Sequence, residues 1–438
     1  MLDYRFIKEN RDAIEENCHN RLVKIDLDAV LALIDRRLDL INQVDDIRRQ
    51  QNDIAQKIKS CRTHEERQPL IQEGARLKQE EKERRGELDQ VLSELKTKAE
   101  QIPNMTHPEA PVGSTEDENV EIKRFGEPTS FSFKPKDHVQ LAHELDLIDF
   151  DGATKVAARA FYYLKNELVM LELGLTRYAL DVVLAEGFTP FITPDLARAD
   201  ILAGTGYNPR GEETQVYSVA DSDLCLIGTA EITLGGLYSG TMLDEAQLPL
   251  KLAGISHCFR TEAGAHGRVA KGLYRVHQFS KVEMFAFTTP EASDDMHDEI
   301  RRIEEKIFSN LDLPFRVVDI CTGDLGGPAY RKFDLEAWMP GREVENKWGE
   351  ITSTSNCTDY QARRLEIKYR SRDGKKKEYV HMLNGTAIAM PRAIIALLEN
   401  NQQADGSIRI PEKLVPYVGF EVIKKKGSSP NAGEGYDI

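Results

Sequence analysis

Two runs of apolar residues with heptad spacing, between about residue 27 and residue 102, constrain the fold of this chain most strongly. The first run returns at spacings of four and three through Leu27, Leu31, Ile34, Leu38 and Ile41, and continues to Ile58. The second run contains Leu70, Leu77, Leu88, Leu92, Leu95, Ala99 and Ile102, with Glu81 and Arg84 in its middle. A long helix with one apolar stripe buries that stripe against a partner helix. The two runs therefore predict an antiparallel helical hairpin.

The connection between the two runs is the polar stretch at residues 60–69, and we expect the chain to reverse at Pro69 and its neighbours. Basic residues are frequent in the hairpin, but acidic residues are interleaved with them. The pattern therefore fits a solvated dimerisation coil about as well as an RNA-binding arm.

A change in composition follows the hairpin. Residues 103–127 are rich in Pro, Gly and acidic residues and show neither the helical nor the strand period. We expect a hairpin domain at residues 1–102, a linker at residues 103–120 and a mixed α/β domain at residues 121–438. In that last domain, short β-branched runs alternate with helical patterns, such as the run over residues 153–187. Residues 424–438 have the composition of a disordered end.

Charge and cysteine spacing exclude several classes of protein. The net charge of −15 over 438 residues argues against a surface broadly adapted to nucleic acid, so any RNA contact must be local and DNA is not an expected partner. The six cysteines form no C-x-x-C pair, so we expect reduced thiols and no zinc, with His257 and Cys258 as packed side chains. No apolar run is long enough for a membrane span, so we expect a cytoplasmic protein without a membrane partner.

The strongest chemical signal is the segment at residues 257–285, HCFRTEAGAHGRVAKGLYRVHQFSKVEMF. An arginine at the end of a strand, Arg260, offers a planar fork of donors that can hold a carboxylate and a phosphate together. A glycine-rich, basic loop at residues 263–272 follows and is expected to act as a lid. Strand alternation then places one set of side chains on a common face: Arg275, His277, Phe279, Lys281, Glu283 and Phe285.

Four other segments accompany it: Thr229-Ala230-Glu231, residues 348–364 (WGEITSTSNCTDYQARR), residues 382–402 (MLNGTAIAMPRAIIALLENNQ), and residues 187–196 (GFTPFITPDL). With these segments the chain resembles the seryl-tRNA synthetases, a family of class II aminoacyl-tRNA synthetases. Residues 257–285 match motif 2 of the class and residues 382–402 match motif 3. The helical run with Pro194 matches motif 1. The resemblance covers essentially the whole chain.

This resemblance implies an α+β fold, in which an antiparallel sheet flanked by helices carries the active site and an N-terminal antiparallel coiled-coil arm binds tRNA. It also implies a homodimer with Pro194 at the interface. The activity implied is ATP-dependent activation of L-serine and its transfer to the 3′ end of tRNA(Ser), with tRNA(Sec) as a further candidate substrate.

The resemblance also assigns site residues. Catalytic roles fall to Arg260 and Glu283, and serine binding to Thr229, Ala230, Glu231, Arg260, Glu283 and Thr386. ATP binding falls to Arg260, Thr261, Glu262, Arg275, Val276, Phe279, Glu350, Ile351, Thr352, Ser353 and Arg392, with Glu350 and Ser353 holding Mg²⁺. A small polar amino acid needs a carboxylate for its ammonium, a clamp for its carboxylate, and polar groups for its hydroxyl. The sequence contains each of these.

Thr352 and Thr354 depart from the pattern, since many members have Ser or Cys there, and AIAMPR at residues 387–392 replaces a glycine-rich form. Two alternatives stay open. One is a related ligase that loads a carrier protein, against which the arm argues. The other is a non-catalytic RNA-binding descendant, against which the intact site residues argue.

Overall fold

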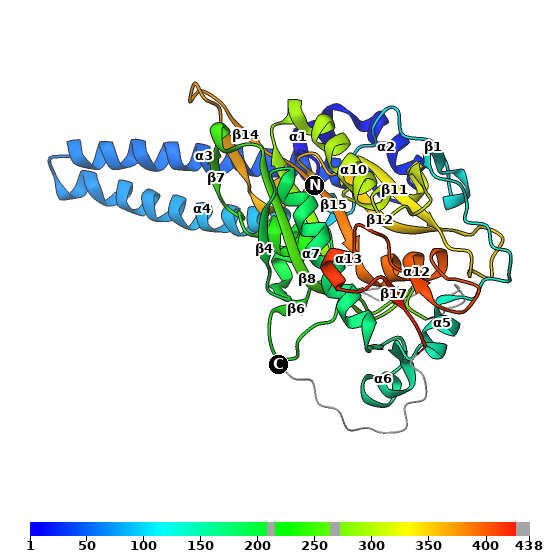
Figure 1. Cartoon of the computed structure of the whole chain (residues 1–438). Helices are drawn as coiled ribbons and strands as arrows, with labels where there is room; N and C mark the ends of the chain where they lie inside the picture. The colour runs from blue at the N-terminus through cyan, green and yellow to red at the C-terminus, as the bar shows by residue number, and fades with distance from the viewer. Residues whose placement is uncertain (208–214, 263–271, 426–438) are drawn as a thin grey trace. The chain divides into compact units, whose positions relative to one another are not determined.

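The computed structural model (Figure 1) describes residues 1–207, 215–262 and 272–425. Residues 263–271 of the predicted basic loop and most of the predicted disordered end lie outside the described residues. The chain divides into two compact units, Met1–Met105 and Thr106–Ile438. Among the described residues, no helix combines the length and the apolar content that a membrane span requires.

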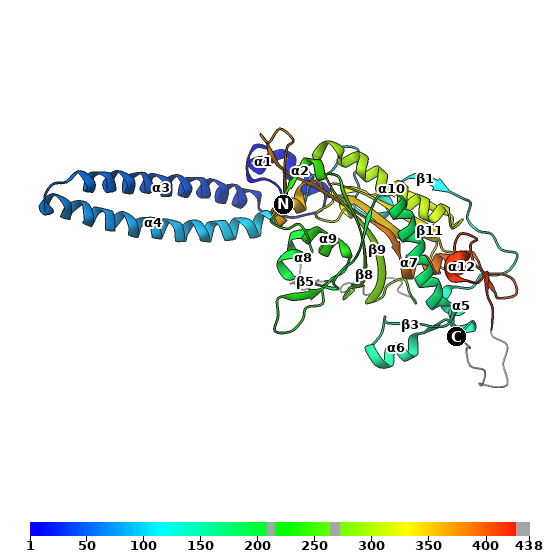
Figure 2. The same ribbon diagram turned by 60° about the vertical axis from the view of Figure 1, so that its left-hand side comes forward.

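The first unit is entirely helical. Two short helices, α1 (Tyr4–Glu9) and α2 (Arg11–Asn20), precede the long helices α3 (Leu27–Ser60) and α4 (His64–Ala99). Figures 1 and 2 both show α3 and α4 lying side by side along their length. The buried seam consists of Leu27, Val30, Ile34, Leu40, Val44 and Ile47 from α3 and Leu77, Leu95 and Ala99 from α4. The predicted antiparallel hairpin is confirmed.

Two details of the predicted hairpin are wrong. Leu31 is only partly buried and Leu38 is 41% exposed, because α3 also packs against α1, and its buried face therefore departs from a strict heptad stripe. The reversal lies before Pro69, which sits inside α4. Thr63 accepts a hydrogen bond from the Glu66 amide at 3.3 Å, and Glu66 accepts one from the Thr63 amide at 3.3 Å. This capping box starts the helix five residues before the proline.

Of the two polar positions within the seam, Glu81 has partners on the opposite helix, whereas Arg84 pairs within its own helix. Glu81 of α4 accepts hydrogen bonds from Arg48 Nε at 3.0 Å and Gln51 Nε2 at 3.1 Å. Glu87 forms ion pairs with Arg36 of α3 and with Arg84 of its own helix. These cross-helix pairs set the register of the hairpin where its apolar seam is interrupted.

The second unit is built on an eight-stranded sheet with the order β1-β10-β11-β12-β15-β9-β8-β4. Every neighbouring pair is antiparallel except β4 and β8. The strands are β1 (Val120–Phe125), β4 (Thr189–Ile192), β8 (Leu250–Phe259), β9 (Gln278–Thr288), β10 (Phe315–Asp319), β11 (Arg331–Trp338), β12 (Trp348–Asn356) and β15 (His381–Ala389).

Helices cover both faces of this sheet. α7 (Glu167–Ala185), α10 (Ser293–Ser309) and α12 (Met390–Asn400) pack on one face, and α9 (Ala230–Gly236) and α11 (Tyr360–Leu365) pack on the other. Figure 2 shows the sheet between these groups. The antiparallel sheet flanked by helices, predicted from the resemblance, is confirmed.

Smaller elements complete the unit. The helices are α5 (His138–Glu144), α6 (Phe150–Ala157), α8 (Ala199–Thr205) and α13 (Val415–Val418). The strands are β2 (Ile148–Asp149), β3 (Tyr163–Leu164), β5 (Leu196–Arg198), β6 (Leu224–Leu226), β7 (Met242–Asp244), β13 (Lys368–Arg370), β14 (Lys377–Tyr379), β16 (Ile408–Arg409) and β17 (Val422–Ile423).

Strand alternation in β9 explains how the sheet presents its chemistry. Val282, Met284 and Ala286 point into the core beneath α7, α10 and α12. Phe285 and Phe287 point into the second core, on the side of α9 and α11. Because side chains alternate, Phe279, Lys281 and Glu283 share the α9 side of the sheet with these two phenylalanines. The site is therefore expected on that side.

One predicted helix in this unit is wrong, and one strand was not predicted. The helical run at residues 153–187 is broken into α6 and α7, because Ala158, Ala160 and Asn166 have positive φ and the intervening β3 pairs with β2. The segment without period at residues 103–127 contains β1, an edge strand. Its side chains are exposed along the whole strand, so they carry no alternation of apolar and polar residues.

Candidate active site

Two adjoining pockets on the α9 side of the sheet share Arg260, Lys281, Glu350 and Thr386. The first is also lined by Glu262, Leu273, Tyr274, Arg275, Val276, Phe279, Ile351, Thr352, Ala389, Pro391 and Arg392. The second also contains Tyr207, Glu231, Glu283, Lys332, Ser353, Ser355 and Asn384. The residues predicted to bind ATP thus gather mainly in the first pocket, and those predicted to bind serine mainly in the second.

Glu231 lies in the first turn of α9 and is buried. Its carboxylate accepts hydrogen bonds from Gln361 Nε2 at 2.7 Å, Asn384 Nδ2 at 3.1 Å and the Tyr207 hydroxyl at 3.2 Å. Thr229 caps the helix by accepting from the Glu231 amide at 3.3 Å. Three donors on separate elements therefore hold one carboxylate in place at the pocket.

Burial is the main influence on the Glu231 carboxyl. Together with the neighbouring charge of Glu283, it raises the pKa of Glu231 to about 7, although the hydrogen bond from Gln361 works in the opposite direction. An ammonium group bound beside it would favour the ionised form. The pocket can therefore bind a cationic group beside the Glu231 carboxylate.

The buried Glu283 lines the same pocket as Glu231. It forms an ion pair with Lys281 and accepts a hydrogen bond from Thr386 Oγ1 at 3.2 Å. Glu283 and Thr386 face each other across β9 and β15, just before a β-bulge in β15. A carboxylate and a hydroxyl held together in this way can accept from and donate to a small hydroxyl group.

Two of the residues predicted to bind serine, Ala230 and Thr229, do not present a free side chain to the pocket as Glu231 and Glu283 do. Ala230 is fully buried, and its methyl group lies against Gly254 of β8, where an added Cβ would come within 2.8 Å. Only its backbone could contact a ligand. Thr229 is 1% exposed, and its hydroxyl is used in capping α9.

Arg260 follows the last residue of β8, as the sequence predicts. Its guanidinium lies over the ring of Phe279, 5.3 Å from the centroid, and its Nη2 lies 3.5 Å from the Gly228 carbonyl. The cation therefore sits between the two pockets. A group in this place can contact a carboxylate in one pocket and a phosphate in the other.

A β-bulge brings Glu350 and Ser353 onto the same side of β12. The register shifts between the pairs Leu335–Thr352 and Glu336–Glu350, so that Glu350, Ser353 and Ser355 all line the second pocket. Strict alternation would place residues 350 and 353 on opposite faces. Three nearby cations, Arg392, Lys332 and Arg260, outweigh burial, which opposes ionisation, and hold the pKa of Glu350 at about 2.

Arg392 stands at the start of α12. It pairs with the Glu350 carboxylate at 2.9 Å and donates to the Glu350 carbonyl at 3.2 Å. Its guanidinium lies 4.9 Å from the centroid of the Tyr274 ring, and the guanidinium of Arg342 lies 5.1 Å from the same centroid. Motif 2 and motif 3 residues are therefore in direct contact.

The remaining predicted ATP residues line or border the first pocket. Glu262 pairs with Arg275 at 3.2 Å, and Thr261 is held by its amide, which donates to the Gln215 carbonyl. Val276 and Ile351 are buried.

Thr352 has a second role. Its hydroxyl donates to Glu304 of α10 at 3.0 Å, on the opposite side of the strand from Ser353. Burial raises the pKa of Glu304 well above its usual range.

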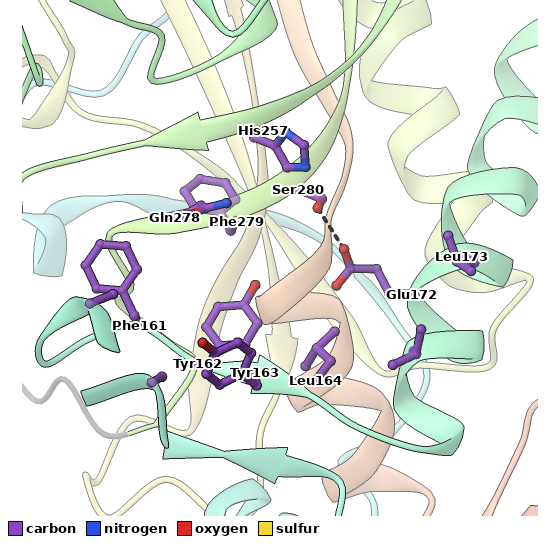
Figure 3. A pocket seen from close by; sticks show the side chains of 13 residues that line it. Phe161, Tyr162, Tyr163, Leu164, Glu172, Leu173, His257, Gln278, Phe279 and Ser280 are labelled. Atoms are coloured by element: carbon purple, nitrogen blue, oxygen red, sulfur yellow. Dashed lines mark hydrogen bonds between the residues drawn. The ribbon is translucent and has the colours of Figure 1, made fainter. Parts of the chain in front are cut away.

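A third pocket lies beside α7, and Figure 3 shows its lining. The Ser280 hydroxyl donates to Glu172 at 2.7 Å, and the aromatic side chains of Phe161 and Tyr162 line the same pocket. Of the predicted site residues, only Phe279 lines it. Apolar side chains of α7 are exposed nearby, with Leu173 at 59%, and Pro194 is exposed just after β4.

One prediction near motif 2 is wrong. His257 is not packed: its side chain is 56% exposed and its Nδ1 pairs with Asp195 at 2.8 Å, because β8 leaves that ring at the surface. Cys258 is buried as predicted. All six cysteines are free thiols. Across residues 1–207, 215–262 and 272–425, no group of three or more His, Cys, Asp or Glu side chains is arranged to hold a metal ion.

Sequence reasoning assigned no role to several residues of the site: Tyr207, Lys281, Lys332, Gln361 and Asn384. Strand alternation identified Lys281 as a neighbour of Glu283. Gln361 and Asn384 lie within the segments that carry the family resemblance, but only the folded chain shows that they bond Glu231. No local pattern in the sequence marks Tyr207 or Lys332.

Comparison with known proteins agrees with this geometry. The model of the seryl-tRNA synthetase N-terminal domain matches residues 1–106. The model of the tRNA synthetase class II core domain (G, H, P, S and T) matches residues 215–401. The serine–tRNA ligases of Treponema denticola and Rubrobacter xylanophilus are each 56% identical over 97% of this chain, covering 100% and 99% of those relatives.

Solved structures give the same result. Seryl-tRNA synthetase from Pyrococcus horikoshii, complexed with ATP, has a TM-score of 0.90 at 39% identity and covers 98% of this chain and 100% of its own. The cytoplasmic serine–tRNA ligase of Naegleria fowleri, in complex with AMP, has a TM-score of 0.86 at 32% identity. The match covers 98% of this chain and 99% of that structure's chain. The chain belongs to the seryl-tRNA synthetase family.

Proposed function

We propose that this chain is an ATP-dependent ligase that activates L-serine as seryl-adenylate and transfers the seryl group to the 3′ end of tRNA(Ser). The observation that carries the proposal is the pair of pockets joined at Arg260, one with Glu231, Glu283 and Thr386 and the other with Arg392 and Phe279. Serine–tRNA ligases similar over 97% of the chain support it.

In the proposed serine complex, Glu231 binds the ammonium group, Arg260 the carboxylate, and Glu283 with Thr386 the hydroxyl. Alanine would leave the last two groups without a ligand partner, which costs binding free energy. Threonine would bring an extra methyl group against side chains that hydrogen bonds hold in place, so they could not easily move to make room for it. The pocket therefore suits serine among the small amino acids.

In the proposed ATP complex, Arg260 lies between the serine carboxylate and the α-phosphate and reduces their repulsion. The carboxylate oxygen forms a bond to the α-phosphorus as the bond to pyrophosphate breaks. Arg275, Glu262 and Arg392 hold the nucleotide, and Phe279 offers a ring for adenine once Arg260 turns toward the phosphates. Positioning and charge neutralisation are enough for this step, so no general base is needed.

Mg²⁺ fits the residues present. Glu350, ionised at neutral pH, and the Ser353 hydroxyl supply oxygen ligands on one side of β12. These two residues would hold the ion together with the phosphate oxygens of ATP. When bound, the ion would neutralise negative charge on the phosphates.

The proposed tRNA partner binds the N-terminal hairpin, and tRNA(Sec) is a second candidate substrate. The match of residues 1–106 to the seryl-tRNA synthetase N-terminal domain supports this assignment. The proposed location is the cytoplasm, and the similarity to the cytoplasmic serine–tRNA ligase of Naegleria fowleri supports it.

The proposed assembly is a homodimer formed through α7 and the β4 edge, including Pro194. Ile192 and Leu173 are 86% and 59% exposed there, and β4 leaves one edge unpaired in the described sheet. Large exposed apolar side chains beside an open strand edge favour association with a second chain.

The decisive experiment measures ATP–pyrophosphate exchange with each of the twenty amino acids and then charging of total tRNA. Exchange restricted to serine, followed by tRNA charging, is expected. Serine-dependent exchange without charging of tRNA would indicate a carrier-protein ligase. Absence of exchange with any amino acid would overturn the proposal in favour of a non-catalytic descendant.

A further inference from the structure

A buried histidine–glutamate pair lies behind the ATP pocket. His138, the first residue of α5, and Glu399, near the end of α12, are 5% and 1% exposed. The Glu399 carboxylate accepts from the His138 amide at 3.0 Å and from the Gly341 amide at 2.9 Å. Its Oε1 also lies 2.9 Å from His138 Nδ1. The carboxylate therefore holds two backbone amides and one nitrogen of the imidazole ring.

The geometry defines the tautomer of that ring. The Leu273 amide lies 3.2 Å from His138 Nε2, and an amide N–H can only donate, so Nε2 must accept. Nδ1 consequently carries the proton and donates to Glu399. A neutral imidazole thus links α12 to the backbone of Leu273.

The ring is packed closely against the chain at this point. Gly272 has a φ of +64°, and a Cβ there would lie 2.2 Å from His138 Nε2. Two residues later, Tyr274 places its ring beneath Arg392 at 4.9 Å. The His138 bond therefore holds the segment that carries Tyr274, Arg275 and Val276 into the ATP pocket.

Both ends of this connection return to one helix. Arg392 and Glu399 are two turns apart in α12 and so lie on the same side of it. The connection runs from Glu399 through His138 and Leu273 to Tyr274 and back to Arg392. A closed arrangement of this kind fixes motif 2 residues relative to motif 3.

We propose that His138 and Glu399 are positioning residues that hold residues 273–276 against α12 in the arrangement that binds ATP. The inference rests on the proposed ATP-dependent activation of serine. Neither side chain lines the ATP or serine pocket, so both act through Leu273 and Tyr274. Substituting either side chain should therefore weaken the binding of ATP and leave the binding of serine unchanged.

The test compares two substitutions of one residue in the full-length protein. His138→Asn keeps a donor near the Nδ1 position but has no acceptor for Leu273, whereas His138→Gln places an amide oxygen near the Nε2 position. We expect His138→Asn to raise KM for ATP in pyrophosphate exchange about tenfold, the effect of one lost buried hydrogen bond. His138→Gln, which keeps an acceptor for Leu273 but loses the donor to Glu399, should raise it less. KM for serine should not change in either.

The matched control is His143→Asn, an exposed histidine on the same helix, which should leave both KM values at the wild-type level. Glu399→Gln provides a second route, since it weakens the acceptor for Nδ1, and its KM for ATP should also rise. In the double variant with His138→Asn the two effects should not add, because they act on one connection.

Two results would overturn the inference. One is an unchanged KM for ATP in both His138→Asn and Glu399→Gln. The other is an equal rise in KM for serine and ATP, which would indicate a general structural role. A wild-type chain with no serine-dependent exchange would instead refute the proposed function, so the two failures are distinguishable.

Discussion

Glu231 is the residue through which the site should respond most directly to pH. Its pKa of about 7 comes mainly from burial and from the nearby Glu283. The carboxyl is neutral below that pH and charged above it, and only the charged form attracts the serine ammonium group. In the proposed serine complex, binding of serine is therefore the step that depends on the ionisation of Glu231.

We predict that kcat/KM for serine falls as the pH drops through about 7, by about tenfold per pH unit once the carboxyl is mostly protonated. Pyrophosphate exchange measured between about pH 5.5 and pH 8 checks this. Glu231→Gln should give a low and flat profile. A wild-type profile that is itself flat over this range would contradict the assignment.

Thr386 is the residue that should govern rejection of alanine. Its hydroxyl donates to Glu283 at 3.2 Å within the proposed serine pocket. Thr386→Val removes this hydroxyl while keeping the volume of the side chain, so kcat/KM for serine should fall about tenfold or more, with a smaller change for alanine. Exchange rates with both amino acids measure the ratio.

The matched control for that change is Thr176→Val in α7. The Thr176 hydroxyl donates to the Glu172 carbonyl within the helix, away from both pockets. It should leave the serine-to-alanine ratio unchanged. An unchanged ratio in Thr386→Val as well would rule out Thr386 as a specificity residue.

At the scale of elements, two β-bulges assemble the site. The bulge in β12 brings Glu350 and Ser353 to one side, and the bulge in β15 follows Thr386 directly. Each bulge offsets the alternation of its strand by one residue. Polar side chains can therefore face the pockets while Thr352 turns toward Glu304 in the opposite layer.

The α3–α4 hairpin is the element whose removal should separate the two half-reactions. Arg48 bonds Glu81, and Ile54 lies 3.8 Å from the position of a Cβ on Gly74, which defines the register. Deleting residues 45–58 together with residues 68–81 removes two heptads from each helix and keeps the turn.

We predict that this shortened chain retains serine-dependent pyrophosphate exchange at the wild-type rate. Its tRNA charging should fall about a hundredfold, corresponding to about 2.8 kcal/mol of lost binding free energy. Aminoacylation with purified tRNA(Ser) measures the second value. Equal loss of both activities would show that the hairpin supports the catalytic unit instead of binding RNA.

At the scale of the whole molecule, the exposed apolar surface of α7 and β4 predicts association. Leu173→Glu places a charge in that surface, and burying an unpaired charge is unfavourable, so the dimer should dissociate. Analytical ultracentrifugation measures the mass. Leu22→Glu is the matched control, because Leu22 is 60% exposed in the first unit and should not affect the mass.

A wild-type chain that sediments as a monomer would contradict the proposed homodimer. A dimer that survives Leu173→Glu would place the interface on another surface. Either result leaves the proposed chemistry of Glu231, Arg260 and Glu283 untouched, because those groups all come from one chain.

The sequence by itself determined the helical hairpin, the family and the types of group in the site. Heptad spacing predicts paired helices because one apolar stripe must be buried. Alternation from Phe279 to Phe285 predicts a strand with a polar face because side chains of a strand alternate. Both rules depend only on residues close together in the sequence, so the sequence alone is enough to apply them.

Only the tertiary structure decided which distant groups meet. The donors to Glu231 come from Tyr207, Gln361 and Asn384, and the acceptor for the Leu273 amide is His138. The packing of α1 on α3 also moved the buried face of the hairpin away from a strict heptad. Such contacts depend on bulges, helix starts and the approach of separate elements, and their energies are shared between residues far apart in the chain. No periodicity in the sequence records them.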